Sequence, residues 1–381
     1  MVRFAAALSQ HPVTAHAVGE AAGQVLERLG EEPDLALLFV TRPHAGALED
    51  AACAVRTILR PHALVGCAAE SVAGAGQEVE RDPAVALWAA RLPAVAPVHL
   101  QVLRTDEGLG LAGWPDQLPF EPEALVLVAD PFSFPAEGFF AWLAEAHPKL
   151  PVVGGMASAA LGPGGNRLAL EDRVHTHGAV GVLLGPGVEV VPIVSQGCRP
   201  IGRPFVVTKS DSLVVEELAG RSAYQRLLEL VQGLSPEEVA VINTGGLHLG
   251  QVIDEHKPEF HRGDFLIRNM LGADEESGAI KVTDVIEVGT TVQFHLRDAE
   301  AADEDLRSLL SAQEADAALL FTCNGRGSRL FGVPDHDARV AADLLGAPPL
   351  AGFFCQGEFG PVGGRNFLHG FTASLALFQS R

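Results

Sequence analysis

A thiol, an amide and a guanidinium stand within four residues in the stretch TCNGRGSRLFG, which follows an apolar strand. They are Cys323, Asn324 and Arg326, and the glycines beside them allow a tight turn or a close backbone approach. A guanidinium can hold a carboxylate through two parallel hydrogen bonds. The stretch therefore predicts a binding group for a ligand carboxylate at Arg326. Its simpler interpretation is a strand-to-helix turn in which Cys323 packs as a small hydrophobe.

An acidic side chain follows another strand in the stretch FFCQGEFGPVGG. Glu358 stands between two glycines and three residues after Cys355, where a carboxylate can bind an ammonium group or act as a base. The stretch GCAAES repeats this arrangement with Cys67 and Glu70. These four residues are predicted ligand-binding positions, and the alternative for each acid is a solvated loop side chain.

A cysteine nucleophile needs a nearby base, which His369 or His44 could supply in the folded chain. The sequence contains no G-x-S-x-G elbow, no P-loop and no G-x-G-x-x-G after a strand. His175-x-His177 has ligand spacing, but no H-E-x-x-H or paired C-x-x-C accompanies it. We therefore expect no catalytic residue and no metal site. A cysteine-dependent enzyme using Cys323 or Cys355 remains an alternative.

One pattern recurs three times, starting at Asp34, Glu123 and Ala315. An apolar strand ends in a small polar cluster, a helix follows, a second apolar strand stops at glycine, and a third apolar strand comes later. The changes of hydrophobic period predict stacked βαββ units. The fold class is therefore α/β, with mixed sheets built from repeated βαββ units flanked by helices, in two closely packed lobes.

Ligands of open α/β sheets collect outside the carboxyl ends of the strands. The polar side chains expected at those ends are Arg42 and His44, Cys67 and Glu70, Asn243 and Thr244, Cys323 to Arg326, and Cys355 to Glu358. For an amino-acid ligand, Arg326 would bind the carboxylate and Glu358 the ammonium group.

Several further elements follow from local signals. The first 30 residues, through QVLERLG, are predicted to form a helix. Residues 47–60 are predicted to form another, with an apolar stripe and an end before Pro61. Ser222 begins a helix, and residues 235–238 form a capping box with proline at the first helical position. The period-two pattern over 265–297 predicts an antiparallel meander. A domain boundary is expected after Ser222, giving domains 1–222 and 223–381.

Charge and composition exclude several classes of function. The formal charge is −21 with no basic run to offset it, which argues against nucleic acid and acidic membrane surfaces as partners. No apolar stretch reaches membrane-spanning length. Five cysteines without a signal peptide indicate reduced thiols, so we expect a cytoplasmic protein.

The ordered set LVGCAAESVAGAG, PVVGGMAS, GRPFVVTKS, RDAEAADEDL, TCNGRG and FFCQGEFGPVGGRNFLHGFTASLALF resembles FIST proteins, named for F-box and intracellular signal transduction. The similarity spans an N-terminal part from about Leu35 to Ser222 and a C-terminal part from about Ala223 to Ala376. The resemblance implies a sensory module that binds a small molecule, with amino acids as the leading suggestion.

Some FIST members resemble haem-binding nitric oxide sensors. The resemblance therefore keeps haem open as a cofactor, with His369 beside Phe353, Phe354, Phe359 and Phe367 as its candidate surroundings. The leading expectation is no cofactor. The chain has no room for an F-box and no kinase or receptor segment, so a separate signalling protein is expected to receive the signal. A purely structural adaptor is a further alternative.

Overall fold

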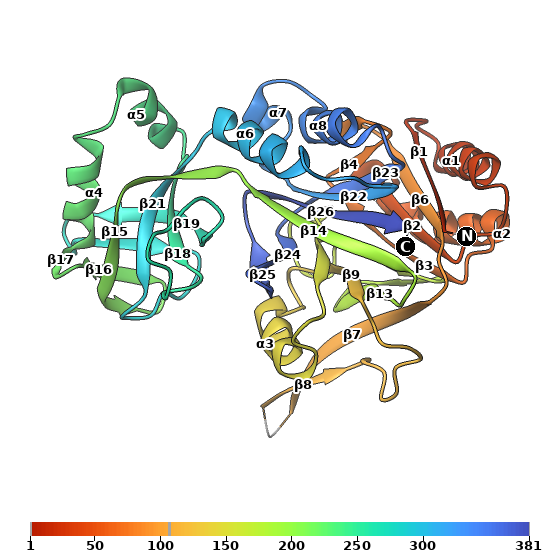
Figure 1. Ribbon diagram of the computed structural model, residues 1–381, viewed down its shortest axis with the longest axis horizontal. Coiled ribbons are helices and arrows are strands. Elements are labelled where there is room, and N and C mark those ends of the chain that lie inside the picture. Colours follow the sequence, from red (N-terminus) through yellow and green to blue (C-terminus); the bar gives the residue numbers. More distant parts are fainter. Residues whose placement is uncertain (1, 106–107, 381) are drawn as a thin grey trace. The chain divides into compact units, whose positions relative to one another are not determined.

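The computed structural model describes residues 2–105 and 108–380. The chain forms two compact units of mixed α/β structure (Figure 1). Unit 1 comprises residues 1–194, 306–368 and 372–381, and unit 2 comprises residues 195–305 and 369–371. Because the residues singled out from the sequence are concentrated in unit 1, its construction determines which of them can meet.

Unit 1 contains the three βαββ copies expected from the sequence, here called repeats I, II and III. Repeat I consists of β2 (Leu35–Thr41), the 3₁₀ helix η1 (Arg42–Ala47), α2 (Leu48–Leu59), β3 (Ala63–Ala69), β4 (Ser71–Gly74), β5 (Gln77–Glu80) and β6 (Val85–Arg91). Repeat II consists of β9 (Ala124–Ala129), α3 (Ala136–Ala146), β10 (Val152–Met156), β11 (Leu168–Leu170), β12 (Arg173–His175) and β13 (Ala179–Leu184). Repeat III consists of β22 (Ala317–Cys323), α7 (Ser328–Phe331), α8 (His336–Leu345), β23 (Leu350–Cys355), β24 (Glu358–Val362), β25 (Arg365–His369) and β26 (Thr372–Ser380).

Each repeat has the same strand pairing. The first two strands are parallel (β2 with β3, β9 with β10, β22 with β23), and the last strand pairs antiparallel with the first. The full orders are β1-β6-β2-β3-β11-β12, β25-β24-β10-β9-β13-β7-β8 and β14-β26-β22-β23-β4-β5. The remaining strands of these sheets, which belong to no repeat, are β1 (Arg3–Ser9), β7 (Val95–Thr105), β8 (Gly108–Ala112) and β14 (Val188–Gln196).

The three repeats exchange hairpins in a closed cycle. The β11–β12 hairpin of repeat II pairs with β3 of repeat I, where Ala169 is opposite Gly66. The β24–β25 hairpin of repeat III pairs with β10 of repeat II, where Phe359 is opposite Gly154. The β4–β5 hairpin of repeat I pairs with β23 of repeat III. Each sheet is therefore completed by another repeat, and loops far apart in sequence are brought to one edge.

A glycine at the same position of each second strand permits this packing. A Cβ atom on Gly66, Gly154 or Gly352 would lie 2.0, 1.9 or 1.7 Å from a carbonyl oxygen of the adjacent first strand. In all three repeats that carbonyl belongs to a leucine, the last of them Leu320. Such distances are far inside van der Waals contact, so only glycine fits. The recurring glycines seen in the sequence mark a structural requirement of the repeat.

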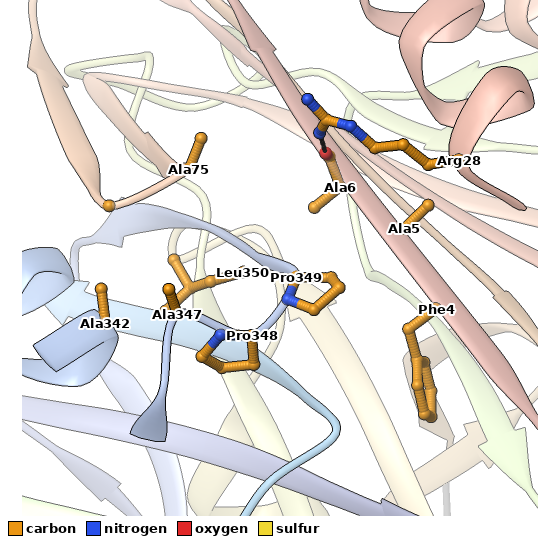
Figure 2. Close-up of a pocket in the computed structure, with 11 residues that line it drawn as sticks. Phe4, Ala5, Ala6, Arg28, Ala75, Ala342, Ala347, Pro348, Pro349 and Leu350 are labelled. Carbon is orange, nitrogen blue, oxygen red and sulfur yellow. Dashed lines mark hydrogen bonds between the residues drawn. The ribbon is translucent and has the colours of Figure 1, made fainter. Parts of the chain in front are cut away.

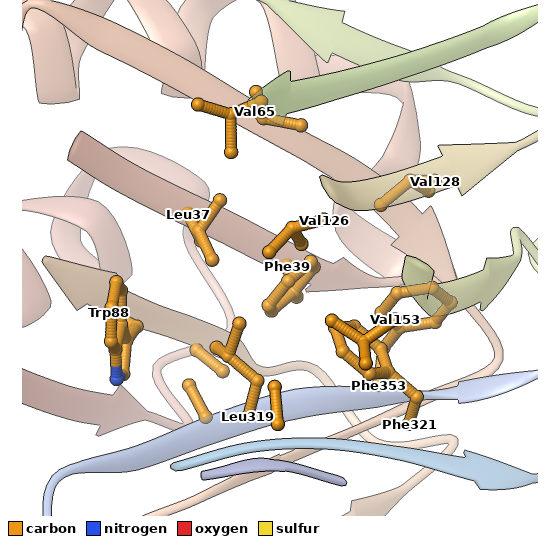
Figure 3. Close-up of a cluster of buried hydrophobic side chains, with 14 of the residues drawn as sticks. Leu37, Phe39, Val65, Trp88, Val126, Val128, Val153, Leu319, Phe321 and Phe353 are labelled. Atoms are coloured by element: carbon orange, nitrogen blue, oxygen red, sulfur yellow. The ribbon is translucent and has the colours of Figure 1, made fainter. Parts of the chain in front are cut away.

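The inner faces of the three sheets share one hydrophobic core. Phe39 of β2, Val126 of β9 and Phe321 of β22 belong to the same fully buried cluster, and Figure 3 shows these side chains pointing toward one another. Phe39 and Phe321 meet edge to face with ring centroids 6.4 Å apart. Burial of one such side chain contributes about 1.5–3 kcal/mol. The shared core explains why the strands are continuously apolar.

Helices cover the outer faces. In α2 the buried positions are Leu48, Ala51, Ala52, Val55 and Leu59, which is a helical stripe. They pack with α1 (Thr14–Leu29) against the first sheet. The helix ends because Arg60 adopts a left-handed conformation (φ 50°) immediately before Pro61. These features agree with the helix predicted for residues 47–60.

Unit 2 is an antiparallel sheet with two short helices. Its elements are β15 (Cys198–Asp211), β16 (Val214–Leu218), β17 (Arg221–Ser222), α4 (Ala223–Val231), α5 (Pro236–Asn243), β18 (Leu247–Val252), β19 (Phe265–Asp274), β20 (Ala279–Val282) and β21 (Thr291–Arg297), followed by α6 (Ala299–Leu310). The strand order is β15-β21-β18-β19-β20-β16-β17, and β15 also pairs with β16. The Ser222 cap and the Ser235–Glu238 capping box are present as predicted.

Three local predictions were wrong. Residues 3–9 form β1 instead of the start of a helix, because they pair antiparallel with β6. The 265–297 segment is no simple meander, since β20 pairs with β19 and β16 whereas β21 pairs with β15 and β18. Asn243 ends α5 and Thr244 caps it, so neither stands at the end of a strand. Within the described ranges, no helix is long and apolar enough to cross a membrane.

Candidate functional site

A pocket of about 630 Å³ lies at the carboxyl ends of β2 and β3 in unit 1. We call it the arginine pocket, and it is lined by Arg42, Pro43, Glu70, Arg81, Leu161 and Arg329. Its residues come from all three repeats: η1 and the ends of β3 and β5 in repeat I, the loop after β10 in repeat II, and α7 in repeat III. The volume is typical of a site for a small molecule.

Two arginines of the pocket share one carboxylate oxygen. Oε1 of Glu70 accepts from Nε of Arg81 at 3.2 Å and from Nη2 of Arg329 at 2.9 Å. Nη1 of Arg329 also donates to the carbonyl oxygen of Asn324 at 2.8 Å. Glu70 is only 18% exposed, whereas Arg81 and Arg329 are 60% and 45% exposed. The pair of guanidinium groups is therefore held in place yet open to solvent.

Arg42 supplies a third guanidinium. It is exposed, and it forms no ion pair with any residue that the structure describes. The pocket thus combines three positive side chains with one negative one, in a chain whose formal charge is −21. Guanidinium groups bind carboxylates and phosphates through paired hydrogen bonds. The chemistry of the pocket is therefore that of an anion site.

The position of Glu70 is fixed by the neighbouring repeats. Its backbone N–H donates to Oγ of Ser158 at 2.9 Å, and Oγ of Ser158 donates to the carbonyl oxygen of Phe354. Ser158 is 3% exposed, so this hydroxyl lies in the interior and has both roles satisfied. One side chain from repeat II thereby orients the acid of repeat I against repeat III.

Arg326, the predicted carboxylate-binding group, lies elsewhere. It is fully buried, and its Nε and Nη2 donate to the two oxygens of Asp337 at 2.7 and 2.8 Å. Thr322 Oγ1 donates to the same carboxylate at 2.7 Å. Burial alone would raise the pKa of Asp337, but the charge and hydrogen bonds of Arg326 hold it below its ordinary value. In this structure the two-pronged pair forms within the protein.

The predicted thiols and the second predicted acid are also interior groups. Cys67 and Cys355 are fully buried, and burial raises the pKa of each thiol well above its ordinary value. This is opposite to the activation that a cysteine nucleophile needs. Glu358 is fully buried and accepts from the backbone N–H and the hydroxyl of Thr372 at 3.2 and 2.8 Å.

The other predicted residues do not line the arginine pocket. His44 is buried, and Nδ1 lies 2.8 Å from the hydroxyl of Thr14 in α1. Cys323 ends β22 and is half-buried, and its sulfur accepts from the N–H of Gly325 at 3.5 Å. Asn324 approaches the pocket through its contact with Arg329. His369 is 4% exposed and belongs to the 369–371 segment of unit 2.

Two of the phenylalanines proposed to surround a haem belong to different hydrophobic clusters. Phe353 lies in the central core, whereas Phe359 packs edge to face on Phe140 of α3 with ring centroids 5.3 Å apart.

The histidines with metal-ligand spacing lie close to His99. The ring centroids of His99 and His175 are 3.8 Å apart, and that of His177 is 6.1 Å from that of His99. Over the described part of the chain, no group of three or more His, Cys, Asp and Glu is arranged to hold a metal ion.

Sequence reasoning identified Arg42 and Glu70 but missed Arg81, Arg329 and Leu161. Arg329 stands in the stretch TCNGRGSRLFG that had been singled out, three residues after Arg326. Arg329 is exposed whereas Arg326 is buried, and this difference could be predicted only from the geometry of the turn between them. Arg81 follows β5, whose place depends on the β4–β5 hairpin pairing with repeat III. No local pattern marks that position.

Two other pockets of unit 1 have different chemistry. One of about 440 Å³ is lined mainly by alanine, proline and other apolar residues, and its single guanidinium, Arg28, donates to the carbonyl oxygen of Ala6, as Figure 2 shows. The other, of about 410 Å³, includes Glu78, Glu80, Asp82 and Asp335. The first offers little charge, and the second would repel an anion. The arginine pocket is therefore the candidate site.

Comparison with known proteins places the chain in a family. Residues 34–221 match the FIST N domain and residues 222–361 match the FIST C domain. Uncharacterized protein Rv0628c of Mycobacterium tuberculosis (strain H37Rv) is 45% identical over 385 residues, and the alignment covers 99% of this chain and the full length of the relative. Uncharacterized protein Mb0898c of Mycobacterium bovis is 45% identical over 389 residues, covering 99% of each chain. The chain belongs to the FIST family, with consecutive FIST N and FIST C domains.

Proposed function

We propose that the protein is a sensor that binds a small metabolite in the arginine pocket, through a carboxylate of an amino acid or a similar compound. FIST domains are associated with signal transduction and small-ligand sensing. The single observation that supports the location is the convergence of three guanidinium groups from two repeats on one open pocket. Such a cluster attracts and orients carboxylates.

The proposal extends to how the signal is used. The pocket is built from three repeats, so a bound ligand would contact loops from each of them. A separate signalling protein would recognise the change in the conformation of these loops. None of the five cysteines forms a disulfide within the described residues, which supports a place in the reducing cytoplasm.

No cofactor forms part of this proposal. The raised pKa of the two buried thiols supports binding over cysteine catalysis as the function. Haem remains an outcome that the first experiment can detect.

A thermal-shift screen of the purified protein tests the proposal. The panel contains the amino acids, small carboxylates and haemin. A ligand at 100 times its Kd stabilises a protein by about 2.7 kcal/mol. With an unfolding entropy of about 2.1 cal/mol/K per residue, this raises the Tm of a 381-residue chain by about 3 °C. We expect a shift with at least one carboxylate. A shift with haemin alone would replace the proposal with a haem sensor, and no shift with any carboxylate would overturn it.

A further inference from the structure

The charges of the arginine pocket are not balanced within the protein. Arg81 and Arg329 both donate to Oε1 of Glu70, so two positive charges share one negative charge. Arg42 adds a third positive charge and pairs with no residue in the described ranges. Two positive charges are thus left over in the lining, one from η1 and one from the Arg81–Arg329 pair.

A ligand with a single carboxylate would neutralise only one of these charges. A neutral amino acid would in addition bring an ammonium group into a pocket that is already positive. Among the residues that the structure describes, Glu70 is the only acid in the lining of the pocket, and two guanidinium groups donate to it. An ammonium group of the ligand therefore lacks a free anionic partner in the lining. Its positive charge would be repelled by the guanidinium groups of the same pocket.

The lining also contains apolar surface. Leu161, in the loop after β10, is 90% exposed, and Pro43 lies beside Arg42. An exposed leucine within a cationic pocket provides a contact for a short carbon chain. A compact phosphate dianion would satisfy the charges but would leave this contact unused.

We propose that the ligand is a small dicarboxylate, with one carboxylate at Arg42 and the other at the Arg81–Arg329 pair. This inference rests on the proposed function, because it specifies the ligand class of the same pocket. Glu70 sets the selectivity. Its carboxylate accepts hydrogen bonds from Arg81 and Arg329, so a ligand must compete with it for these two guanidinium groups. Only a ligand with a second acidic group competes effectively.

Glu70→Gln tests this role because it keeps the shape of the side chain and removes its charge. The dicarboxylate would then face no internal competitor, and its Kd should fall about tenfold, equivalent to about 1.4 kcal/mol. If Glu70 instead binds the ligand's ammonium group, the same variant weakens the binding of amino acids.

The experiment is calorimetric titration of the full chain at low ionic strength, where charge pairs are least screened. The ligands are succinate, glutarate and L-glutamate, with propionate, L-glutamine and inorganic phosphate as matched comparisons. We expect at least one dicarboxylate to bind tenfold more tightly than its monocarboxylate counterpart, and Glu70→Gln to tighten it further.

The outcomes separate this inference from the proposed function. If L-glutamine or propionate binds as tightly as its dicarboxylate counterpart, the pocket still binds a carboxylate but the dicarboxylate inference is wrong. If inorganic phosphate binds and no dicarboxylate does, the ligand is a phosphate compound and the inference is also wrong. If none of these ligands binds, the dicarboxylate inference is wrong, and the wider thermal-shift panel decides separately whether the proposed function is wrong as well.

Discussion

The backbone N–H of Glu70 donates a 2.9 Å hydrogen bond to the hydroxyl of Ser158. Both residues stand four positions after the glycine that marks the second strand of their repeat, Gly66 and Gly154. They are therefore equivalent positions of repeats I and II that contact each other directly. The acid that lines the arginine pocket and the side chain that orients it arise from one repeated position, with a different residue in each copy.

Removing the Ser158 hydroxyl should loosen this junction. Ser158→Ala leaves the N–H of Glu70 and the carbonyl of Phe354 without their partner in a buried setting. An unsatisfied buried group costs about 1–3 kcal/mol. We expect a loss of that size in the free energy of unfolding, measured in denaturant. Ser212→Ala, at an exposed serine of unit 2, is the control. Equal stability of the two variants would contradict the role given to Ser158.

The Arg326–Asp337 pair is expected to act as a structural element. Arg326→Met removes the guanidinium that donates to both oxygens of the fully buried Asp337 carboxylate, and breaking a buried pair on one side costs about 3–5 kcal/mol. Arg326→Met combined with Asp337→Leu should recover much of this loss. Thermal unfolding of the two single variants and the double variant measures the coupling. If Arg326→Met is as stable as the natural protein but loses ligand binding, Arg326 is a binding residue after all.

Glu78 should make the protein less stable as pH rises. Burial, followed by the negative charge of Asp337, raises the pKa of Glu78 to about 8 from an ordinary 4.5. The folded state thus holds this proton more tightly than the unfolded state. The corresponding stability is complete below pH 4.5 and is lost as pH approaches 8, by about 1.4 kcal/mol per pH unit.

Glu78→Gln keeps an acceptor for the N–H of Ala338 and removes the titration. Unfolding measured from pH 5 to pH 8 should show the variant gaining stability relative to the natural protein as pH rises. Parallel stability curves for the two proteins over that range would rule out this account of Glu78.

Two histidines of unit 2 should have the opposite effect. His248 and His295 are directly opposite each other on β18 and β21, and burial lowers the pKa of each to about 4. The unfolded state binds the proton first, so their contribution is complete above pH 6.5 and is lost as pH falls toward 4. Each contributes a slope of about 1.4 kcal/mol per pH unit.

His248→Phe or His295→Phe should therefore reduce the loss of stability in acid. Phenylalanine keeps ring contacts with Phe371 or Phe265, which lie 4.2 and 4.6 Å from the two imidazole centroids. The exposed His256 provides the control substitution. An unchanged acid slope in both buried-site variants would refute the assignment.

The sequence predicted the repeats because their signals are local. The three strand–helix–strand copies, the glycine at Gly66, Gly154 and Gly352, and the caps at Ser222 and Ser235 each depend on a few neighbouring residues. The strand at residues 3–9 was not predicted, because this alanine-rich stretch lacks the alternation typical of a strand. Its structure depends on the pairing with β6, which is distant in the sequence.

The site was only partly predictable because hairpin exchange is a long-range feature. Arg42 and Glu70 were found because they directly follow strands. Arg81 reaches the pocket only because β4 pairs with β23, nearly 280 residues later in the chain. Arg326 looked like a free binding group because its partner, Asp337, lies on the next long helix and gives no signal in the local motif.

The compact units also do not follow the family boundary. The FIST N match ends at residue 221, yet repeat III lies beyond it and completes unit 1 together with repeats I and II. Unit 2, at residues 195–305, spans the junction between the two matches. The arginine pocket accordingly takes Arg42 from the FIST N part and Arg329 from the FIST C part.

The most direct test of the central claim is calorimetric titration of L-glutamate, or of the strongest ligand in the thermal screen, into three proteins. These are the natural chain, Arg42→Ala and Arg173→Ala, the last changing an exposed arginine outside the pocket. We expect Arg42→Ala to raise the Kd at least tenfold, a loss of about 1.4 kcal/mol, and Arg173→Ala to leave it unchanged. Equal Kd values for the natural chain and Arg42→Ala would show that the ligand binds elsewhere.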